Sequence, residues 1–141
     1  MIEESPFDTV GATLSLMRIL VVEDQDSIRR MIEALVVARG YEVTAVGTGT
    51  KAIDVAATDP PDMVLLDLMI PGYDGFEVCR RLRSDPRTQS TPILIISALD
   101  DPESRTKAAA AGATAFYTKP FSPMALLKEI ERHRTVAKAV S

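Results

Sequence analysis

The chain contains four short, predominantly apolar runs, and a polar or charged residue stands at the end of each one. The runs are Ile19–Val22, Met63–Leu66, Ile93–Ile96 and Ala115–Thr118, and the residues that follow them are Glu23 with Asp24, Asp67, Ser97 and Lys119, respectively. Apolar runs of this length are typical of strands buried on both faces of a parallel sheet. Because the carboxyl ends of parallel strands lie at one edge, where ligands bind in open α/β sheets, we expect the polar residues to meet there.

Segments with helical periodicity separate these runs. After the first run, apolar residues follow the stripe of an amphipathic helix at Ile28, Met31, Ile32, Leu35 and Val36. Further segments predict a strand over Glu42–Val46 and helices over Thr50–Ala57, Gly75–Ser84 and Glu103–Ala111, with a last helix that begins at Pro123. Five strands alternating with five helices through short connections predict an α/β fold with helices on both faces of a parallel sheet.

Length and composition define the class of protein. A chain of 141 residues with 46% apolar and 26% charged residues is typical of one soluble globular domain, predicted over residues 17–131. Residues 1–16 are interpreted as a flexible leader, and residues 132–141 as a frayed helix end, tail or linker stub. A net charge of −4 argues against direct nucleic-acid binding.

Three further features of the composition narrow the location and chemistry. The absence of an apolar stretch near the roughly 20 residues that span a bilayer predicts a cytoplasmic protein without membrane contact. With Cys79 as the single cysteine, the chain cannot form an intramolecular disulfide, and Cys79 is predicted to be a buried core residue. The single histidine, His133, is predicted to be a solvated surface residue, so a histidine-based catalytic pair is not expected.

The expected edge of the sheet brings together groups suited to phosphoryl chemistry. Glu23, Asp24 and Asp67 repel one another when ionised, and a cation among them relieves that repulsion. Oxygen ligands of this kind suit Mg²⁺, which uses one or two carboxylates together with phosphate oxygens. Lys119 adds a positive charge and Ser97 a hydroxyl donor. A carboxylate in such a site can be the nucleophile of phosphoryl transfer, which yields an aspartyl phosphate.

The segments ILVVEDQ, VLLDLMIPGYDG, ILIISAL and FYTKPF together resemble the receiver domain of two-component response regulators, a CheY-like family. The resemblance covers about residues 17–131. It implies a flavodoxin-like three-layer sandwich with strand order 2-1-3-4-5. The roles that it implies are phosphoacceptor for Asp67, Mg²⁺ ligands for Glu23, Asp24, Asp67 and the carbonyl of Met69, switch hydroxyl for Ser97, and phosphate contact for Lys119, which precedes a cis Pro120.

The resemblance also implies partners and a mode of action. The phosphoryl donor would be the phosphohistidine of a sensor histidine kinase or a phosphotransfer protein. The domain would be a switch that catalyses its own phosphorylation and dephosphorylation, not an enzyme acting on other substrates. Two copies would pair through the face formed by Glu103–Ala111, Ala115–Thr118 and the last helix. Phe116 stands where many receivers have a switch tyrosine, so it either switches through packing alone or is simply a core aromatic.

Two residues that flank the phosphoacceptor in the family pattern are apolar here. Met69 and Leu99 occupy these positions, where side chains can control the access of water to the aspartyl phosphate. We therefore expect slow hydrolysis of the phosphorylated form.

Two other functions are compatible with parts of the sequence. Gly47-Thr48-Gly49-Thr50-Lys51-Ala52 fits the G-x-G-x-x-A pattern of dinucleotide-binding turns, and Asp67 follows at roughly the spacing of a ribose-binding acid. This alternative gives no role to Glu23, Asp24, Ser97 or Lys119. The second alternative is a receiver that binds a partner without being phosphorylated.

Overall fold

The structure is a computed structural model that describes the backbone of residues 17–139 and the side chains of residues 17–134. The leader predicted for residues 1–16 lies outside the described residues. The elements, in chain order, are β1 (Arg18–Val22), α2 (Asp26–Val37), β2 (Glu42–Val46), α3 (Gly49–Thr58), β3 (Met63–Leu66), α4 (Gly75–Ser84), β4 (Ile93–Ser97), α5 (Pro102–Ala111), β5 (Ala115–Thr118) and α6 (Pro123–Ala139).

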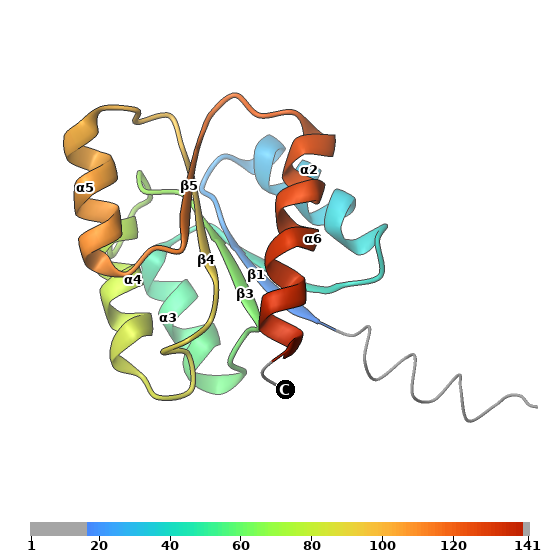
Figure 1. Cartoon of the computed structure of the whole chain (residues 1–141), viewed down its shortest axis with the longest axis horizontal. Helices are drawn as coiled ribbons and strands as arrows, with labels where there is room; N and C mark the ends of the chain where they lie inside the picture. Colours follow the sequence, from blue (N-terminus) through green and yellow to red (C-terminus); the bar gives the residue numbers. More distant parts are fainter. Residues whose placement is uncertain (1–16, 140–141) are drawn as a thin grey trace, which may run out of the picture.

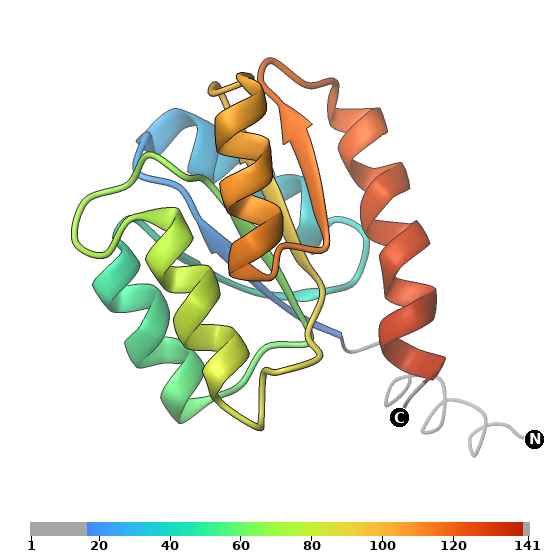
Figure 2. The same cartoon turned by 60° about the vertical axis from the view of Figure 1, so that its left-hand side comes forward.

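The five strands form one parallel sheet between two layers of helices. Their order is β2-β1-β3-β4-β5, and every neighbouring pair is parallel. Helices α3, α4 and α5 cover one face, and α2 and α6 cover the other (Figures 1 and 2). The predicted fold class and strand order are confirmed. In the part of the chain that the structure describes, no helix combines the length and the apolar character needed to cross a membrane.

Side chains of each central strand alternate between two separate halves of the core. In β3, Val64 and Leu66 belong to the cluster under α3, α4 and α5, whereas Met63 and Leu65 belong to the cluster under α2 and α6. All four are fully buried. A strand buried on both faces needs apolar residues at every position, which explains the short apolar runs in the sequence.

The helices begin and end at residues with a physical reason to be there. Thr48, Asp74 and Asp101 each precede a helix, and each side-chain oxygen accepts a hydrogen bond from a backbone N–H of the first turn. Ser122 accepts in the same way from Ala125 at the start of α6. These caps fix where α3, α4, α5 and α6 begin, and so they define the C-terminal ends of the loops that follow β2, β3, β4 and β5.

Three details of the two outer helices differ from the sequence interpretation or extend it. The apolar stripe predicts a buried Met31, but this residue is 40% exposed because the buried face of α2 is centred on Ile32 and Val36. The helix α6 continues to Ala139, beyond residue 131 where the predicted domain ends. The prediction of a solvated His133 is wrong: its side chain is only 16% exposed and lies 3.3 Å from the hydroxyl of Tyr117.

A single arginine joins α4, the loop before β4 and the end of α5. The guanidinium of Arg83 donates hydrogen bonds to the carbonyl oxygens of Gly112 at 2.8 Å and Thr91 at 2.7 Å, and to the hydroxyl of Thr114 at 3.3 Å. Burial lowers the pKa of this guanidinium. Gly112 has a φ of 105°, and a Cβ there would lie 2.6 Å from Cγ of Arg83. The glycine therefore serves both the helix end and the close approach of the arginine.

We predict that Arg83→Ala lowers the free energy of unfolding by about 2 kcal/mol, because it leaves several partly buried acceptors without donors. Arg80→Ala is the matched control on the same helix, since the Arg80 side chain is exposed and forms an exposed ion pair with Glu77. That control should change stability by no more than about 0.5 kcal/mol. Urea denaturation of both variants gives the comparison, and equal losses would contradict the role assigned to Arg83.

Candidate functional site

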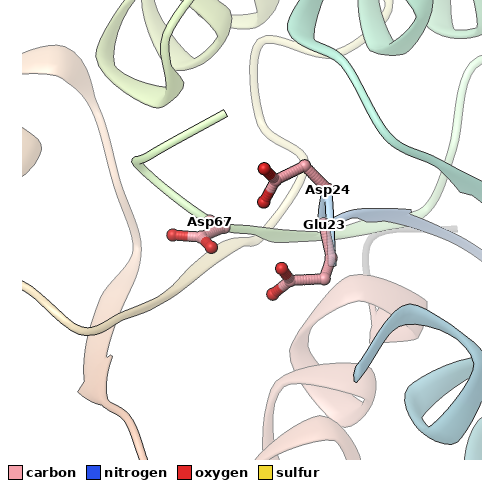
Figure 3. Close-up of side chains that lie close together, drawn as sticks. All are labelled: Glu23, Asp24 and Asp67. Atoms are coloured by element: carbon pink, nitrogen blue, oxygen red, sulfur yellow. The ribbon is translucent and has the colours of Figure 1, made fainter. Parts of the chain in front are cut away.

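Three carboxylates converge where β1 and β3 end. Glu23 and Asp24 follow β1 directly, and Asp67 follows β3 (Figure 3). One oxygen of each carboxylate lies within 4.8 Å of the others. Glu23 and Asp67 are buried, whereas Asp24 is exposed. The register of β1 against β3 pairs Val22 with Leu66, so the residues that follow are held side by side.

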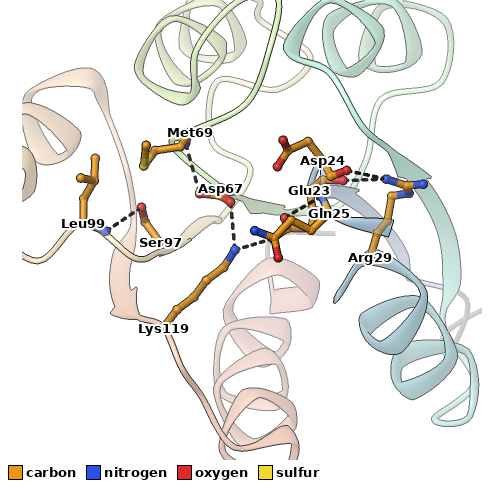
Figure 4. Close-up of polar contacts among 9 residues, drawn as sticks. All are labelled: Glu23, Asp24, Gln25, Arg29, Asp67, Met69, Ser97, Leu99 and Lys119. Atoms are coloured by element: carbon orange, nitrogen blue, oxygen red, sulfur yellow. Dashed lines mark hydrogen bonds and ion pairs between the residues drawn. The ribbon is translucent and has the colours of Figure 1, made fainter. Parts of the chain in front are cut away.

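Lys119 supplies the positive charge of this cluster. Its ammonium lies 2.6 Å from Oε1 of Glu23 and 2.9 Å from Oδ2 of Asp67 (Figure 4). Burial by itself lowers the pKa of Lys119, but hydrogen bonds and charge attraction from Glu23 and Asp67 outweigh it, and the net pKa is raised. The lysine is therefore charged at neutral pH. The peptide bond that follows it, Lys119–Pro120, is cis, as predicted.

Both oxygens of the Asp67 carboxylate have fixed partners. Oδ1 accepts a hydrogen bond from the backbone N–H of Met69 at 3.1 Å, and Oδ2 is bound by Lys119. Ser97, at the end of β4, is fully buried, and its hydroxyl accepts a hydrogen bond from the N–H of Leu99 at 3.2 Å (Figure 4). The structure thus brings all of the sequence-predicted polar residues to one edge of the sheet.

The donor set at this edge fits a divalent cation. Three carboxylates and one ammonium leave an excess of negative charge, and two of the carboxylates are buried. Carboxylate oxygens are the hard ligands that Mg²⁺ binds. Oε2 of Glu23 also accepts a hydrogen bond from the N–H of Gln25 at 3.1 Å, which orients this side chain within the loop.

Phe116 and Tyr117 lie on opposite faces of β5. Phe116 packs against the core under α3, α4 and α5, and the guanidinium of Arg105 from α5 lies 4.6 Å from its ring centre. Tyr117 packs on the other side and donates a hydrogen bond to Glu129 at 2.5 Å. Burial and this hydrogen bond raise the pKa of Tyr117 to about 12. Tyr117 therefore lies on the side of the sheet that α2 and α6 cover, and Phe116 is the β5 aromatic that contacts α5.

Arg105 was not identified from the sequence. Besides its contact with Phe116, its guanidinium donates to Asp100 at 2.9 Å and to the hydroxyl of Thr118 at 2.9 Å. This side chain thus links the loop after β4 with the end of β5. An arginine on an exposed helix face carries no sequence signal for such a contact, because the contact depends on where β5 lies.

The glycine-rich turn between β2 and α3 is covered by another part of the chain. The N–H of Gly49 donates to the carbonyl of Pro71 at 2.9 Å, and a Cβ on Gly49 would lie 1.9 Å from the carbonyl oxygen of Tyr73. The loop between β3 and α4 therefore occupies the space that a dinucleotide pyrophosphate needs at this turn. This arrangement does not favour the dinucleotide-binding alternative.

Comparison with known proteins agrees with this geometry. Residues 19–131 match the family model described as response regulator receiver domain. The response regulator PleD of Caulobacter vibrioides is 43% identical over 113 residues, which cover 80% of this chain and 25% of PleD. The chain spans 25% of the length of PleD and 49% of the length of another curated relative that it matches, a probable transcriptional regulator ycf27 of Porphyridium aerugineum.

Solved structures show the same fold. The chemotaxis response regulator CheY4 of Vibrio cholerae superimposes with a TM-score of 0.79 at 33% identity, covering 83% of this chain and 98% of CheY4. The N-terminal receiver domain of Klebsiella pneumoniae RstA gives a TM-score of 0.76 at 32% identity, covering 83% and 97% of the two chains. The chain belongs to the response regulator receiver domain family. It is therefore the receiver domain of a two-component response regulator, a signalling switch.

We predict that Lys119→Ala lowers the free energy of unfolding by about 3 kcal/mol, because Glu23 and Asp67 then face each other without a counter-charge. Replacing Glu23 by Gln in the same chain should restore part of the loss, since one charge of the repelling pair is gone. The matched control is Lys51→Ala on α3, whose side chain is exposed. Chemical denaturation without added cation measures all three variants. A Lys119→Ala protein as stable as the Lys51→Ala protein would contradict the prediction.

Proposed function

We propose that this domain is switched by phosphorylation of Asp67, with a phosphohistidine of a sensor histidine kinase or phosphotransfer protein as the donor. The observation that carries the proposal is the arrangement around the Asp67 carboxylate. Lys119 binds one of its oxygens, the Met69 N–H binds the other, and two further acids lie beside it. Membership in the receiver family supports a phosphohistidine-bearing partner.

The side chains around Asp67 suit the transfer step. One carboxylate oxygen of Asp67 attacks the phosphorus, a P–O bond forms, and the P–N bond to the donor histidine breaks, so the histidine nitrogen regains its electron pair. The Asp67 side chain is held in one orientation, which reduces the cost of reaching the reactive geometry. Lys119 lies within hydrogen-bond distance of Asp67, so its ammonium is placed to balance charge on the transferred group.

The same proposal assigns Glu23, Asp24, Asp67 and the carbonyl of Met69 as the groups that would hold Mg²⁺. Their fit rests on the close approach of the three carboxylates and on the burial of two of them. A bound Mg²⁺ would supply positive charge for the phosphoryl oxygens and relieve the repulsion among these acids. Because Lys119 already binds two of the three carboxylates, the ion and the ammonium would share the negative charge of the site.

We propose that the switch runs from Ser97 to the surface formed by α5, β5 and α6. The Ser97 hydroxyl accepts a hydrogen bond from the Leu99 N–H at the end of β4, and its own proton can turn to donate to a phosphoryl oxygen. Phe116 then repacks beneath Arg105. Because phenylalanine has no hydroxyl, this step works through packing alone. A population shift of this kind requires only that the phosphoryl group bind one arrangement better than the other. Pairing of two copies through this face remains part of the proposal.

Beryllofluoride with Mg²⁺ tests the phosphoacceptor. RstA, one of the similar structures, was solved with its receiver domain activated by BeF3, so this phosphoryl mimic suits the fold. We expect beryllofluoride and Mg²⁺ to shift the backbone amide resonances of Met69, Leu99 and the loop after β5. Asp67→Ala should abolish these shifts, because the mimic forms its bond to the Asp67 carboxylate.

The matched control for that experiment is Asp54→Ala, which removes an exposed carboxylate from α3. This variant should respond as the unmodified protein does. An unmodified protein that shows no response would favour the alternative of a receiver that binds its partner without phosphorylation.

The flanking residues give a prediction for the lifetime of the phosphorylated form. Met69 is 59% exposed, and Leu99 is partly buried beside Ser97. We expect Met69→Asn or Leu99→Asn to shorten the lifetime of the aspartyl phosphate several-fold, because a polar side chain there can hold a water for attack. The measurement is the loss of label from protein phosphorylated with a radioactive small-molecule donor. Met124→Asn, which replaces an exposed methionine on α6, is the control. Unchanged lifetimes in both variants would contradict the assignment.

A further inference from the structure

Arg29 reaches back from α2 to the loop that carries two of the site's carboxylates. Its guanidinium donates hydrogen bonds to the backbone carbonyl of Glu23 at 3.0 Å and to that of Asp24 at 3.4 Å (Figure 4). A further nitrogen lies 2.5 Å from the carboxylate of Asp26. In these contacts Arg29 binds the main chain of Glu23 and Asp24 and not their carboxylates, so both carboxylates can still face a ligand.

The turn after β2 makes room for this arginine. A Cβ on Gly47 would lie 3.3 Å from Nη1 of Arg29, a tight contact that would require the guanidinium to shift by a few tenths of an ångström. The N–H of Glu23 donates to the carbonyl of Val46 at 3.0 Å, so the same turn also holds the loop directly. Two residues on, Gly49 contacts the loop that carries Met69, through Pro71 and Tyr73. One glycine-containing turn therefore contacts both the loop that carries Glu23 and Asp24 and the loop that carries Asp67 and Met69.

We propose that Arg29, accommodated by Gly47, is a positioning residue for the divalent-cation site at Glu23 and Asp24. The inference rests on the proposed Mg²⁺ site and adds a residue to it. The guanidinium fixes the main chain of the loop before the ion arrives, so less ordering is required on binding. Loss of an outer group that orients metal ligands through hydrogen bonds typically weakens metal binding by roughly 10- to 100-fold.

The charge of Arg29 and its support of the loop have opposite effects on Mg²⁺ affinity, and this makes the inference testable. A positive group close to a cation site repels the cation, so loss of the Arg29 charge should by itself strengthen Mg²⁺ binding. Loss of the support to the loop should weaken it. Lysine at this position retains the charge, but a single ammonium cannot reproduce the planar fork that reaches two carbonyls and a carboxylate.

The experiment compares Arg29→Ala, Arg29→Lys and Arg30→Ala by following backbone amide resonances during titration with Mg²⁺. Arg30 is the next residue along α2 and is exposed, so Arg30→Ala removes the same charge without touching the loop contacts. We expect both Arg29 variants to bind Mg²⁺ about tenfold more weakly or worse. The Arg30 variant should bind as the unmodified protein does, or slightly more tightly. Arg29→Ala or Arg29→Lys binding Mg²⁺ as tightly as the unmodified protein would overturn the inference.

Hydrogen exchange without Mg²⁺ separates this inference from the proposed function. The Gln25 N–H, which donates to Glu23 within the supported loop, should exchange faster in both Arg29 variants than in Arg30→Ala. If the unmodified protein does not bind Mg²⁺, the proposed function fails, and the exchange rates still decide whether Arg29 holds the loop. Equal exchange of the Gln25 N–H in the Arg29 variants and the Arg30 control would overturn the inference.

Discussion

The bridge from Lys119 to Glu23 and Asp67 is the interaction on which the edge of the sheet depends. It joins residues that are 96 and 52 positions apart, at the ends of β5, β1 and β3. Two buried carboxylates close to each other are unfavourable without a positive charge, and Lys119 supplies it within hydrogen-bond distance. Binding of a cation or a phosphoryl group would change the charge that surrounds this ammonium. In the proposed mechanism, Lys119 therefore serves both the stability of the fold and the phosphoryl chemistry.

The parallel sheet explains how so few residues create this site. Each central strand is apolar along its length because helices cover both faces, and polar residues appear only where the strand leaves the core. The register of β1, β3 and β4 then places those residues side by side. Side-chain caps at the starts of α4, α5 and α6 anchor the far ends of the loops that follow β3, β4 and β5. The positions of the strand ends thus bring the site residues together. Backbone hydrogen bonds from the loops then orient their side chains, as the Met69 N–H does for Asp67.

Two arginines connect this edge with the surrounding helices in different ways. Arg29 contacts the main chain of the loop after β1, on the side where the acids lie. Arg105 contacts the Phe116 ring and the end of β5, on the side where a receiver transmits its signal in the proposed mechanism. In the two proposals made above, Arg29 prepares the site before an ion binds, and Arg105 lies where the switch is transmitted. Both use the planar guanidinium to contact several groups at once.

The sequence by itself determined the fold class, the strand order through the family resemblance, and the edge to which Glu23, Asp24, Asp67, Ser97 and Lys119 come. It did so because strands that are buried on both faces of a sheet require apolar runs, and polar residues follow these runs in the sequence. Only the tertiary structure decided which segments the Gly47–Gly49 turn contacts, how far His133 is buried and what Arg29 and Arg105 bind. These features depend on which segments approach one another across the fold. A single arginine on a helix, or a short glycine pattern, does not indicate which residues far away in the sequence will contact it.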